Sequence, residues 1–238
     1  MGIIGRAGVV CQAFSWSGGG VGCEFRKVRR TCLLWVHTFS LILRQGFPIL
    51  WKMDLVLFGI QGSGKGTQAK KLCAQYGFDL FEAGGELRKI AASGSNLGAT
   101  VKSFIDVGKL VPFEIIMQVV KEAIAARSKA QKILFDGIPR DLDQMRSFDR
   151  IMVEAGRDFT CIEIALTQEE GVQRILGRAK VEGRADDANE ETIRRRMKTF
   201  FEKTKPVIEL YKAAGKLVEV DGNGTVDEVY DAVKKQLR

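Results

Sequence analysis

Short apolar runs alternate with segments of helical spacing along residues 53–238. The runs predict buried strands at 54–58, 79–82, 132–135, 160–166 and 217–220. Between them, apolar residues recur three and four positions apart, which predicts helices over 67–75, 85–92, 97–107, 112–127, 142–155, 168–178, 190–214 and 226–237. Strands that alternate with helices indicate an α/β fold with a doubly wound, mostly parallel sheet of five strands. Residues 83–111 and 179–189 exceed this repeat, and we expect both to be inserts over a site.

The composition changes at Met53. Residues 1–52 hold seven Lys or Arg against one acidic residue, all three Trp and the only histidine, and they carry +6 of the net charge of +8. They lack a sustained helical or strand period, so we expect a poorly ordered basic extension before a single domain at 53–238. A basic arm for nucleic acid or anionic lipid and a targeting peptide are the alternatives.

The overall composition excludes several classes of protein. The 238 residues are 45% hydrophobic and 28% charged, without an apolar run of eighteen, which predicts a water-soluble protein with no membrane partner. Five cysteines that never form CxxC predict neither a disulfide framework nor a zinc knuckle, and they fit a reducing cytoplasm. With His37 as the only histidine, Ser-His-Asp catalysis and histidine-ligated metals are not expected.

One glycine-rich segment carries a specific chemical signal. GIQGSGKGT, residues 59–67, has the GxxxxGK spacing and stands between a predicted strand and a predicted helix. Glycines let consecutive backbone N–H groups surround an anion, and the helix N-terminus adds partial positive charge. We therefore expect a nucleotide phosphate to bind at Gly62, Ser63, Gly64, Lys65, Gly66 and Thr67.

Six further segments follow in a fixed order: AGGELR at 83–88, GKLVP at 108–112, DGIPR at 136–140, RILGR at 174–178, GRADD at 183–187 and ETIRRR at 191–196. Together with GSGKGTQ at 62–68, they resemble the motifs of adenylate kinases and related nucleoside monophosphate kinases. The resemblance covers 53–238 and none of 1–52. It implies a P-loop nucleoside monophosphate kinase fold with an NMP-binding helical insert at about 83–111 and a short lid at about 179–189.

The resemblance also implies an activity and its machinery. A monomeric, cytoplasmic enzyme would transfer a phosphoryl group from MgATP to AMP and give two ADP, with no nucleic-acid partner. The short lid lacks the four metal-ligating residues of some relatives, so zinc is not expected. Asp136 ends a predicted strand beside the loop-bearing strand, where a carboxylate can hold Mg²⁺ through water.

Arginines match the chemistry of two facing nucleotides, because guanidinium groups neutralise phosphate oxygens. By position in the family's pattern, the catalytic groups are Lys65, Arg140, Arg174, Arg178, Arg184 and Arg196, of which Arg174 and Arg178 also bind ATP. The AMP-binding residues are Ala83, Arg88, Lys109, Val111, Gly137, Arg140, Gln144, Arg184 and Arg196. Gln144 would read the acceptor base, and Arg88 and Arg140 would hold the acceptor phosphate.

The identity of the acceptor has two readings. Ala83 and Gly85 stand where adenylate kinases usually have threonine and aspartate, and alanine at this position resembles UMP/CMP kinases. Gln144 favours AMP. A UMP/CMP kinase is therefore the alternative, and a P-loop protein that binds nucleic acid through its basic arm is a more distant one. A GTPase is disfavoured because the sequence contains no NKxD motif.

Overall fold

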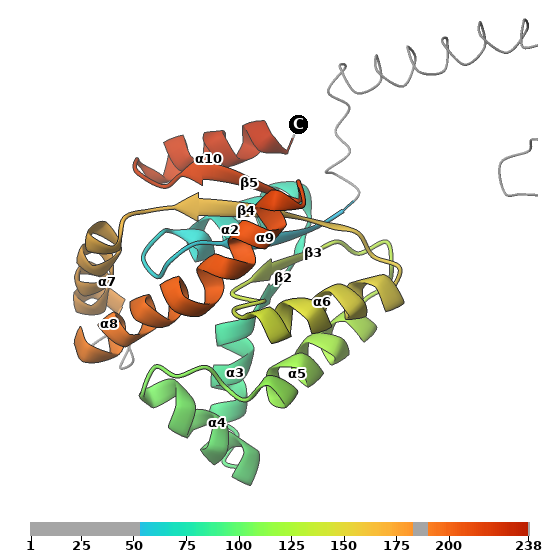
Figure 1. The fold of residues 1–238 in the computed structure, drawn as a ribbon, viewed down its shortest axis with the longest axis vertical. Helices are drawn as coiled ribbons and strands as arrows, with labels where there is room; N and C mark the ends of the chain where they lie inside the picture. Colours follow the sequence, from blue (N-terminus) through green and yellow to red (C-terminus); the bar gives the residue numbers. More distant parts are fainter. Residues whose placement is uncertain (1–52, 183–189, 238) are drawn as a thin grey trace, which may run out of the picture. The chain divides into compact units, whose positions relative to one another are not determined.

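The structure is a computed structural model that describes residues 53–182 and 190–237, without the side chains of 178–182. In these residues, five parallel strands form one sheet in the order β2-β3-β1-β4-β5 (Figure 1). The strands are β1 (Asp54–Phe58), β2 (Asp79–Glu82), β3 (Ile133–Asp136), β4 (Phe159–Ala165) and β5 (Leu217–Asp221). The predicted α/β sheet is confirmed, and its described strands are parallel throughout.

Helices cover both faces of this sheet (Figure 1). One face packs against α2 (Lys65–Tyr76) and α10 (Val226–Gln236), and the other against α5 (Phe113–Ala125), α6 (Leu142–Glu154) and α9 (Lys205–Ala213). Between β2 and α5, the chain forms α3 (Ala83–Ala91) and α4 (Asn96–Asp106), which extend away from the sheet (Figure 1). The helices α7 (Gln168–Glu182) and α8 (Glu190–Thr199) and the π-helix η3 (Phe200–Thr204) lead into α9.

The central strand β1 shows why the sequence reads as continuous apolar runs. Leu55 and Leu57 belong to the core under α2 and α10, whereas Val56 and Phe58 belong to the core under α5, α6 and α9. Side chains alternate between the faces of a strand, and a sheet covered on both faces therefore needs apolar residues at every position. Because all the described strands are parallel, their carboxyl ends lie at the same edge of the sheet.

Two helices differ from the sequence prediction. The segment 190–214, predicted as one helix, consists of α8, η3 and α9 and ends at Ala213. The helix predicted over 168–178 continues to Glu182, four residues into the expected lid. The rest of the expected lid, 183–189, lies outside the described residues, as does the expected extension 1–52.

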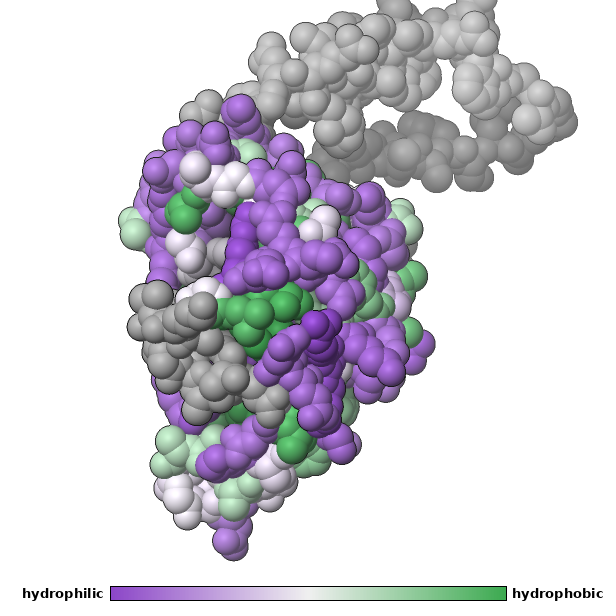
Figure 2. Space-filling model, turned by 90° about the vertical axis from the view of Figure 1, so that its left-hand side faces the viewer, coloured by the Kyte–Doolittle hydropathy of each residue, from purple (hydrophilic) through white to green (hydrophobic). Residues whose placement is uncertain are grey.

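The face of the molecule that carries α7 and α8 is mainly polar in the described residues. Seen from the side of α7 and α8, hydrophilic residues predominate around a smaller hydrophobic patch (Figure 2). In 53–182 and 190–237, no helix has the length and apolar character needed to cross a bilayer.

Candidate active site

The loop between β1 and α2 has a backbone that requires glycine. Gly62 and Gly64 have φ angles of 84° and 87°, in the left-handed region that side chains disfavour. A Cβ on Gly62 would also lie 2.5 Å from the carbonyl oxygen of Gly171 at the start of α7. The close approach of α7 therefore fixes this loop from outside, a contact that sequence spacing did not indicate.

Lys65 begins α2 and folds back over the same loop. Its Nζ donates hydrogen bonds to the carbonyl oxygens of Gly59, at 2.6 Å, and Ile60, at 2.8 Å. The ammonium group thus lies at the N-terminal end of a helix, where backbone N–H groups already favour an anion. The loop and Lys65 together have the properties of a phosphate-binding site.

A cavity of about 320 Å³ lies at the carboxyl ends of β1, β2 and β3. Phe58, Glu82 and Asp136, the last residues of these strands, all line it. From the predicted donor site, the cavity brings together Gly62, Gly64, Lys65, Gly66 and Thr67. From the predicted acceptor site, it brings together Ala83, Arg88, Lys109, Val111, Gly137, Arg140, Gln144 and Arg196.

Four predicted site residues are not placed in this cavity. Ser63 is a buried residue of the loop, and its hydroxyl has no hydrogen-bond partner among the described residues. Arg174 donates to the carbonyl oxygen of Gly222 after β5, at 3.1 Å, and to Glu170 on α7, at 2.7 Å. Arg178 belongs to α7 and Arg184 to 183–189, and their side chains lie outside the described part of the chain. The roles given to these residues stay predictions.

Asp136 lies where the predicted metal ligand should be. β1 and β3 are neighbours, and Leu57 is its register partner, so Asp136 ends the strand beside the phosphate loop. A Cβ on Gly66 would lie 3.8 Å from Asp136 Oδ2, which shows that the carboxylate faces the first turn of α2. Burial raises the pKa of Asp136, while the charges of Lys65 and Arg140 act in the opposite direction.

Arg140 is held by its own turn and by a helix from the far end of the chain. Its Nε donates to the carbonyl oxygen of Gly137, at 2.7 Å, and its backbone N–H donates to Gln144 Oε1, at 2.9 Å. Its carbonyl oxygen accepts from the hydroxyl of Thr204, the last residue of η3, at 2.8 Å. Burial lowers the pKa of Arg140, an effect that nearby Asp136 opposes and Arg196 and Arg88 reinforce. The charges of Arg88 and Arg196, which line the same cavity, therefore act on the guanidinium of Arg140.

Gln144 lines the cavity with its side-chain amide tied to its own segment. Besides accepting from Arg140, its Nε2 donates to Asp141 Oδ2, at 3.2 Å. Nε2 has a second N–H and Oε1 a second lone pair, so the predicted contact with an acceptor base does not require either bond to break. Ala83 is buried in the same wall and offers no hydroxyl to a base.

The residues present fit a magnesium ion. Mg²⁺ prefers oxygen ligands and is held in kinases by one or two carboxylates, waters and substrate phosphates. Asp136 supplies a carboxylate that faces the start of α2, and the exposed Thr67 supplies a hydroxyl on the same cavity. In the described residues, no group of three or more His, Cys, Asp or Glu could hold a metal alone. A cation here would thus depend on ligands from the substrate.

Glu82 and Thr204 are among the side chains of the cavity that the sequence did not predict. Glu82 ends β2 and forms an ion pair with Arg88, with 2.7 Å between Oε1 and Nη2. Glu82 directly precedes the motif at 83–88, a position that suggests nearness to the site but does not show that the side chain faces a guanidinium. Thr204 reaches Arg140 from η3, and nothing in the hydrophobic spacing of the sequence indicates this contact.

Comparisons with known proteins agree with this geometry. The family model described as adenylate kinase matches residues 57–216. An adenylate kinase of Thermus thermophilus is 42% identical over 184 residues, covering 77% of this chain and 96% of that relative. Adenylate kinases of Maricaulis maris and Parabacteroides distasonis are 38% and 34% identical over 186 residues, which cover 78% of this chain and 98% and 97% of those relatives. The chain belongs to the adenylate kinase family of nucleoside monophosphate kinases.

Proposed function

We propose that this chain catalyses reversible transfer of the terminal phosphoryl group of ATP to AMP, giving two ADP. The observation that carries the proposal is a single cavity in which the phosphate loop with Lys65 meets Arg88, Arg140 and Arg196. Two nucleotides that react through their phosphates bring several negative charges into one place, and such a set of cations balances them.

On the donor side, the loop would hold the triphosphate by its backbone N–H groups. Lys65 would exchange its bonds to Gly59 and Ile60 for bonds to the outer phosphates, because a charged acceptor binds an ammonium more strongly than a carbonyl does. Arg174 and Arg178 on α7 and Arg184 in 183–189 would bind the donor or the transferred group.

On the acceptor side, Arg88 and Arg140 would hold the phosphate of AMP and Gln144 its base. An oxygen of this phosphate attacks the γ-phosphorus of ATP. The new P–O bond forms as the bond from the γ-phosphorus to the β,γ-bridging oxygen breaks, and its electron pair stays on the departing ADP. The acceptor phosphate is already anionic at neutral pH, so the step needs orientation and charge stabilisation rather than a base.

Asp136, with Thr67, would hold the Mg²⁺ that accompanies ATP. The bound ion neutralises charge on the β- and γ-phosphates. Asp136 is ionised above its raised pKa, and its burial favours contact with a cation over contact with bulk water.

The proposal includes a monomer in the cytoplasm. One copy of the chain supplies residues for both proposed subsites, since the phosphate loop and Arg88, Arg140 and Arg196 line the same cavity. Cys73 and Cys161, the described cysteines, are free thiols, the state that a reducing compartment maintains.

An acceptor panel tests the proposal. With MgATP as donor, a coupled assay of ADP formation should give a kcat/KM for AMP at least about tenfold above those for UMP, CMP and GMP, a difference of about 1.4 kcal/mol in transition-state binding. A preference for UMP or CMP would assign the chain to pyrimidine acceptors instead.

Lys65→Ala tests the phosphate loop in the same assay. We expect kcat to fall by about 10²- to 10³-fold, as when one donor to developing charge is removed. Lys102→Ala, which removes an exposed lysine paired with Asp106 on α4, is the matched control and should keep wild-type kcat. Wild-type kcat in Lys65→Ala would contradict the assignment of the loop.

A further inference from the structure

Glu82 places a negative charge where the acceptor phosphate is proposed to bind. Its register partner on β3 is Asp136, so carboxylates end two adjacent strands at the cavity. Glu82 Oε1 accepts a hydrogen bond of 2.7 Å from Arg88 Nη2, and both residues line the cavity. One guanidinium of the acceptor site therefore already has an anionic partner within the chain.

The backbone around this ion pair leaves room for it. A Cβ on Gly84 would lie 3.1 Å from Arg88 Nη1, and a Cβ on Gly85 would lie 3.4 Å from Glu82 Cδ. Glycine is a poor helix former, yet both glycines stand in the first turn of α3. A side chain at position 84 would therefore press on the guanidinium of Arg88, whereas one at position 85 would make only ordinary contact with Glu82.

The pair is exposed enough to be exchanged. The side chains of Arg88 and Glu82 are 40% and 38% exposed, so water can solvate either partner when they separate. A phosphate offers two charges and several oxygens to a guanidinium and can replace one carboxylate. The carboxylate then remains close to the bound phosphate and repels it.

Its charge also reaches the other groups of the site. Burial is the main cause of the raised pKa of Asp136, and Glu82 adds to it. Burial is likewise the main cause of the lowered pKa of Arg140, which Glu82 opposes. The negative charge of Glu82 therefore affects both Asp136 and Arg140.

We propose that Glu82 sets the affinity of the acceptor-phosphate subsite by competing with the incoming phosphate for Arg88. This inference rests on the proposed function, in which Arg88 holds that phosphate. Any anion at the subsite meets the same competitor. Small anions, which have no nucleoside contacts to compensate, are therefore held too weakly to block the site, whereas a nucleoside monophosphate still binds.

Glu82→Gln removes the charge and keeps the shape of the side chain. Calorimetric titration with AMP should give a dissociation constant about fivefold lower than that of the wild type. Inorganic phosphate, measured as a competitor of the nucleoside monophosphate at saturating MgATP, should show an inhibition constant lower by the same factor. Equal factors are expected because the competitor acts on the phosphate that both ligands share. Glu82→Ser, a second neutral variant, should show the same tightening.

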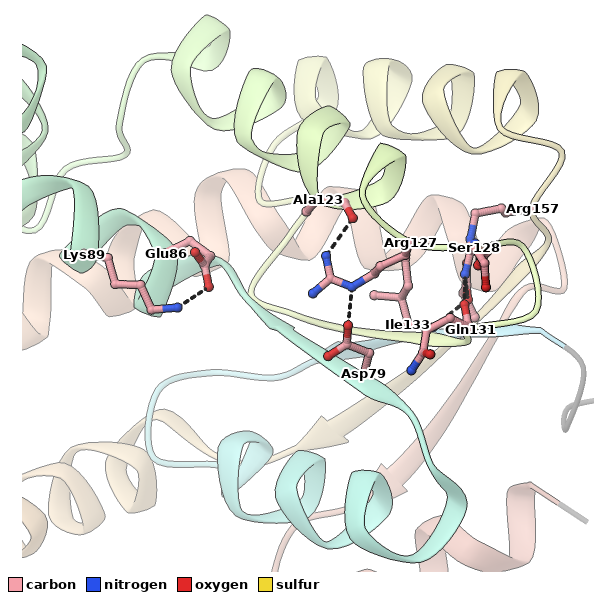
Figure 3. Close-up of polar contacts among 10 residues, drawn as sticks. Asp79, Glu86, Lys89, Ala123, Arg127, Ser128, Gln131, Ile133 and Arg157 are labelled. Carbon is pink, nitrogen blue, oxygen red and sulfur yellow. Dashed lines mark hydrogen bonds and ion pairs between the residues drawn. The ribbon is translucent and has the colours of Figure 1, made fainter.

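Glu86→Gln is the matched control. Like Glu82→Gln, it replaces one carboxylate by a neutral amide. Glu86 lies on α3, pairs with Lys89 at 2.8 Å (Figure 3) and does not line the cavity. Its constants for AMP and phosphate should equal those of the wild type. Equal tightening in Glu86→Gln would show a general field effect and overturn the proposal, as would unchanged or weaker binding in both folded Glu82 variants.

The test separates this inference from the proposed function. If the wild type bound UMP or CMP but not AMP, the acceptor assignment would fail. The inhibition constant of inorganic phosphate, measured in competition with the nucleoside monophosphate that the chain does accept, would still show whether Glu82 competes with phosphate for Arg88.

Discussion

Asp136 shows, at the scale of one residue, how a site can require a group that its surroundings disfavour. Burial raises its pKa, and Lys65 and Arg140 compensate only in part. A group whose pKa is higher in the folded chain than in the unfolded chain binds its proton more tightly when folded. Its ionised form therefore lowers the stability of the fold at neutral pH, and the proposed role of holding a cation would account for its presence.

Asp136→Asn is expected to raise stability and impair catalysis. The free energy of unfolding at pH 8 should exceed that of the wild type, and the Mg²⁺ concentration for half-maximal rate should rise about 10- to 100-fold. The stability gap should narrow as pH falls through the raised pKa toward the ordinary value of 3.8, since the wild-type carboxyl then takes up its proton.

Urea unfolding at pH 8, 6 and 5, with Asp106→Asn as an exposed control, measures this gap. A variant less stable than the wild type at pH 8 would mean that Lys65 and Arg140 stabilise the carboxylate more than burial disfavours it.

The sequence predicted individual site residues where a motif requires a given residue type at a given spacing. Lys65 follows from GxxxxGK between a strand and a helix, and the cavity does contain Lys65, Arg88, Arg140 and Arg196. Glu82 did not follow, because a glutamate at a strand end has the same pattern whether it faces solvent or a guanidinium. Its pairing depends on the path of α3, which only the fold determines.

At the scale of an element, η3 links two parts of the site that are distant in sequence. It separates α8, which carries Arg196, from α9, and Thr199, Phe200 and Thr204 line the cavity. π-Helical turns often occur at functional sites. Apolar spacing predicted one helix over 190–214, because a widened turn shifts the phase of the pattern without interrupting it. Burial of Val207 and Ile208 against the sheet keeps the later turns in place.

Thr204→Val tests whether this turn positions Arg140. Valine keeps the volume but leaves the carbonyl oxygen of Arg140 without its 2.8 Å bond. We expect KM for AMP to rise about three- to tenfold, since an unpaired polar group costs about 1 kcal/mol or more, while KM for ATP changes less than twofold.

Thr204→Ser restores the hydroxyl and should recover most of the affinity for AMP. Steady-state kinetics with each substrate varied separates these effects. Equal increases in both KM values would indicate general loosening of η3 rather than a role for Thr204 in the acceptor site.

At the scale of the whole molecule, the two edges of the sheet differ in chemistry. The carboxyl edge holds the cavity, as the parallel topology predicts. At the other edge, Asp54 accepts two hydrogen bonds from Arg157, at 2.7 and 3.0 Å, and one from the backbone of Ile133, at 2.8 Å. The sequence predicted all five strands and, through Asp136, that β3 lies beside β1. It did not predict the rest of the strand order or this ion pair, since both depend on contacts between distant segments.

Arg157→Met tests whether this edge stabilises the fold without affecting the site. Arg157 and Asp54 are only 5% and 3% exposed, and Arg157 also donates to backbone carbonyls of the chain that leads into β3, at Ser128 and Gln131 (Figure 3). Loss of the guanidinium leaves a buried carboxylate unpaired, so the free energy of unfolding in urea should fall by about 3–5 kcal/mol. Because the pair is at the edge of the sheet away from the cavity, kcat and both KM values at 20 °C should stay within about twofold of the wild type.

Arg127→Met is the control at the same edge. Arg127 pairs with Asp79 at the start of β2 (Figure 3), where the carboxylate side chain is 40% exposed. Water can solvate that carboxylate when its partner is removed, so the loss of stability should be about 1 kcal/mol. Equal losses in the two variants would show that burial of the Asp54 pair is not decisive. A large rise in KM for Arg157→Met would show that substrate binding depends on the amino edge of the sheet as well as on the cavity.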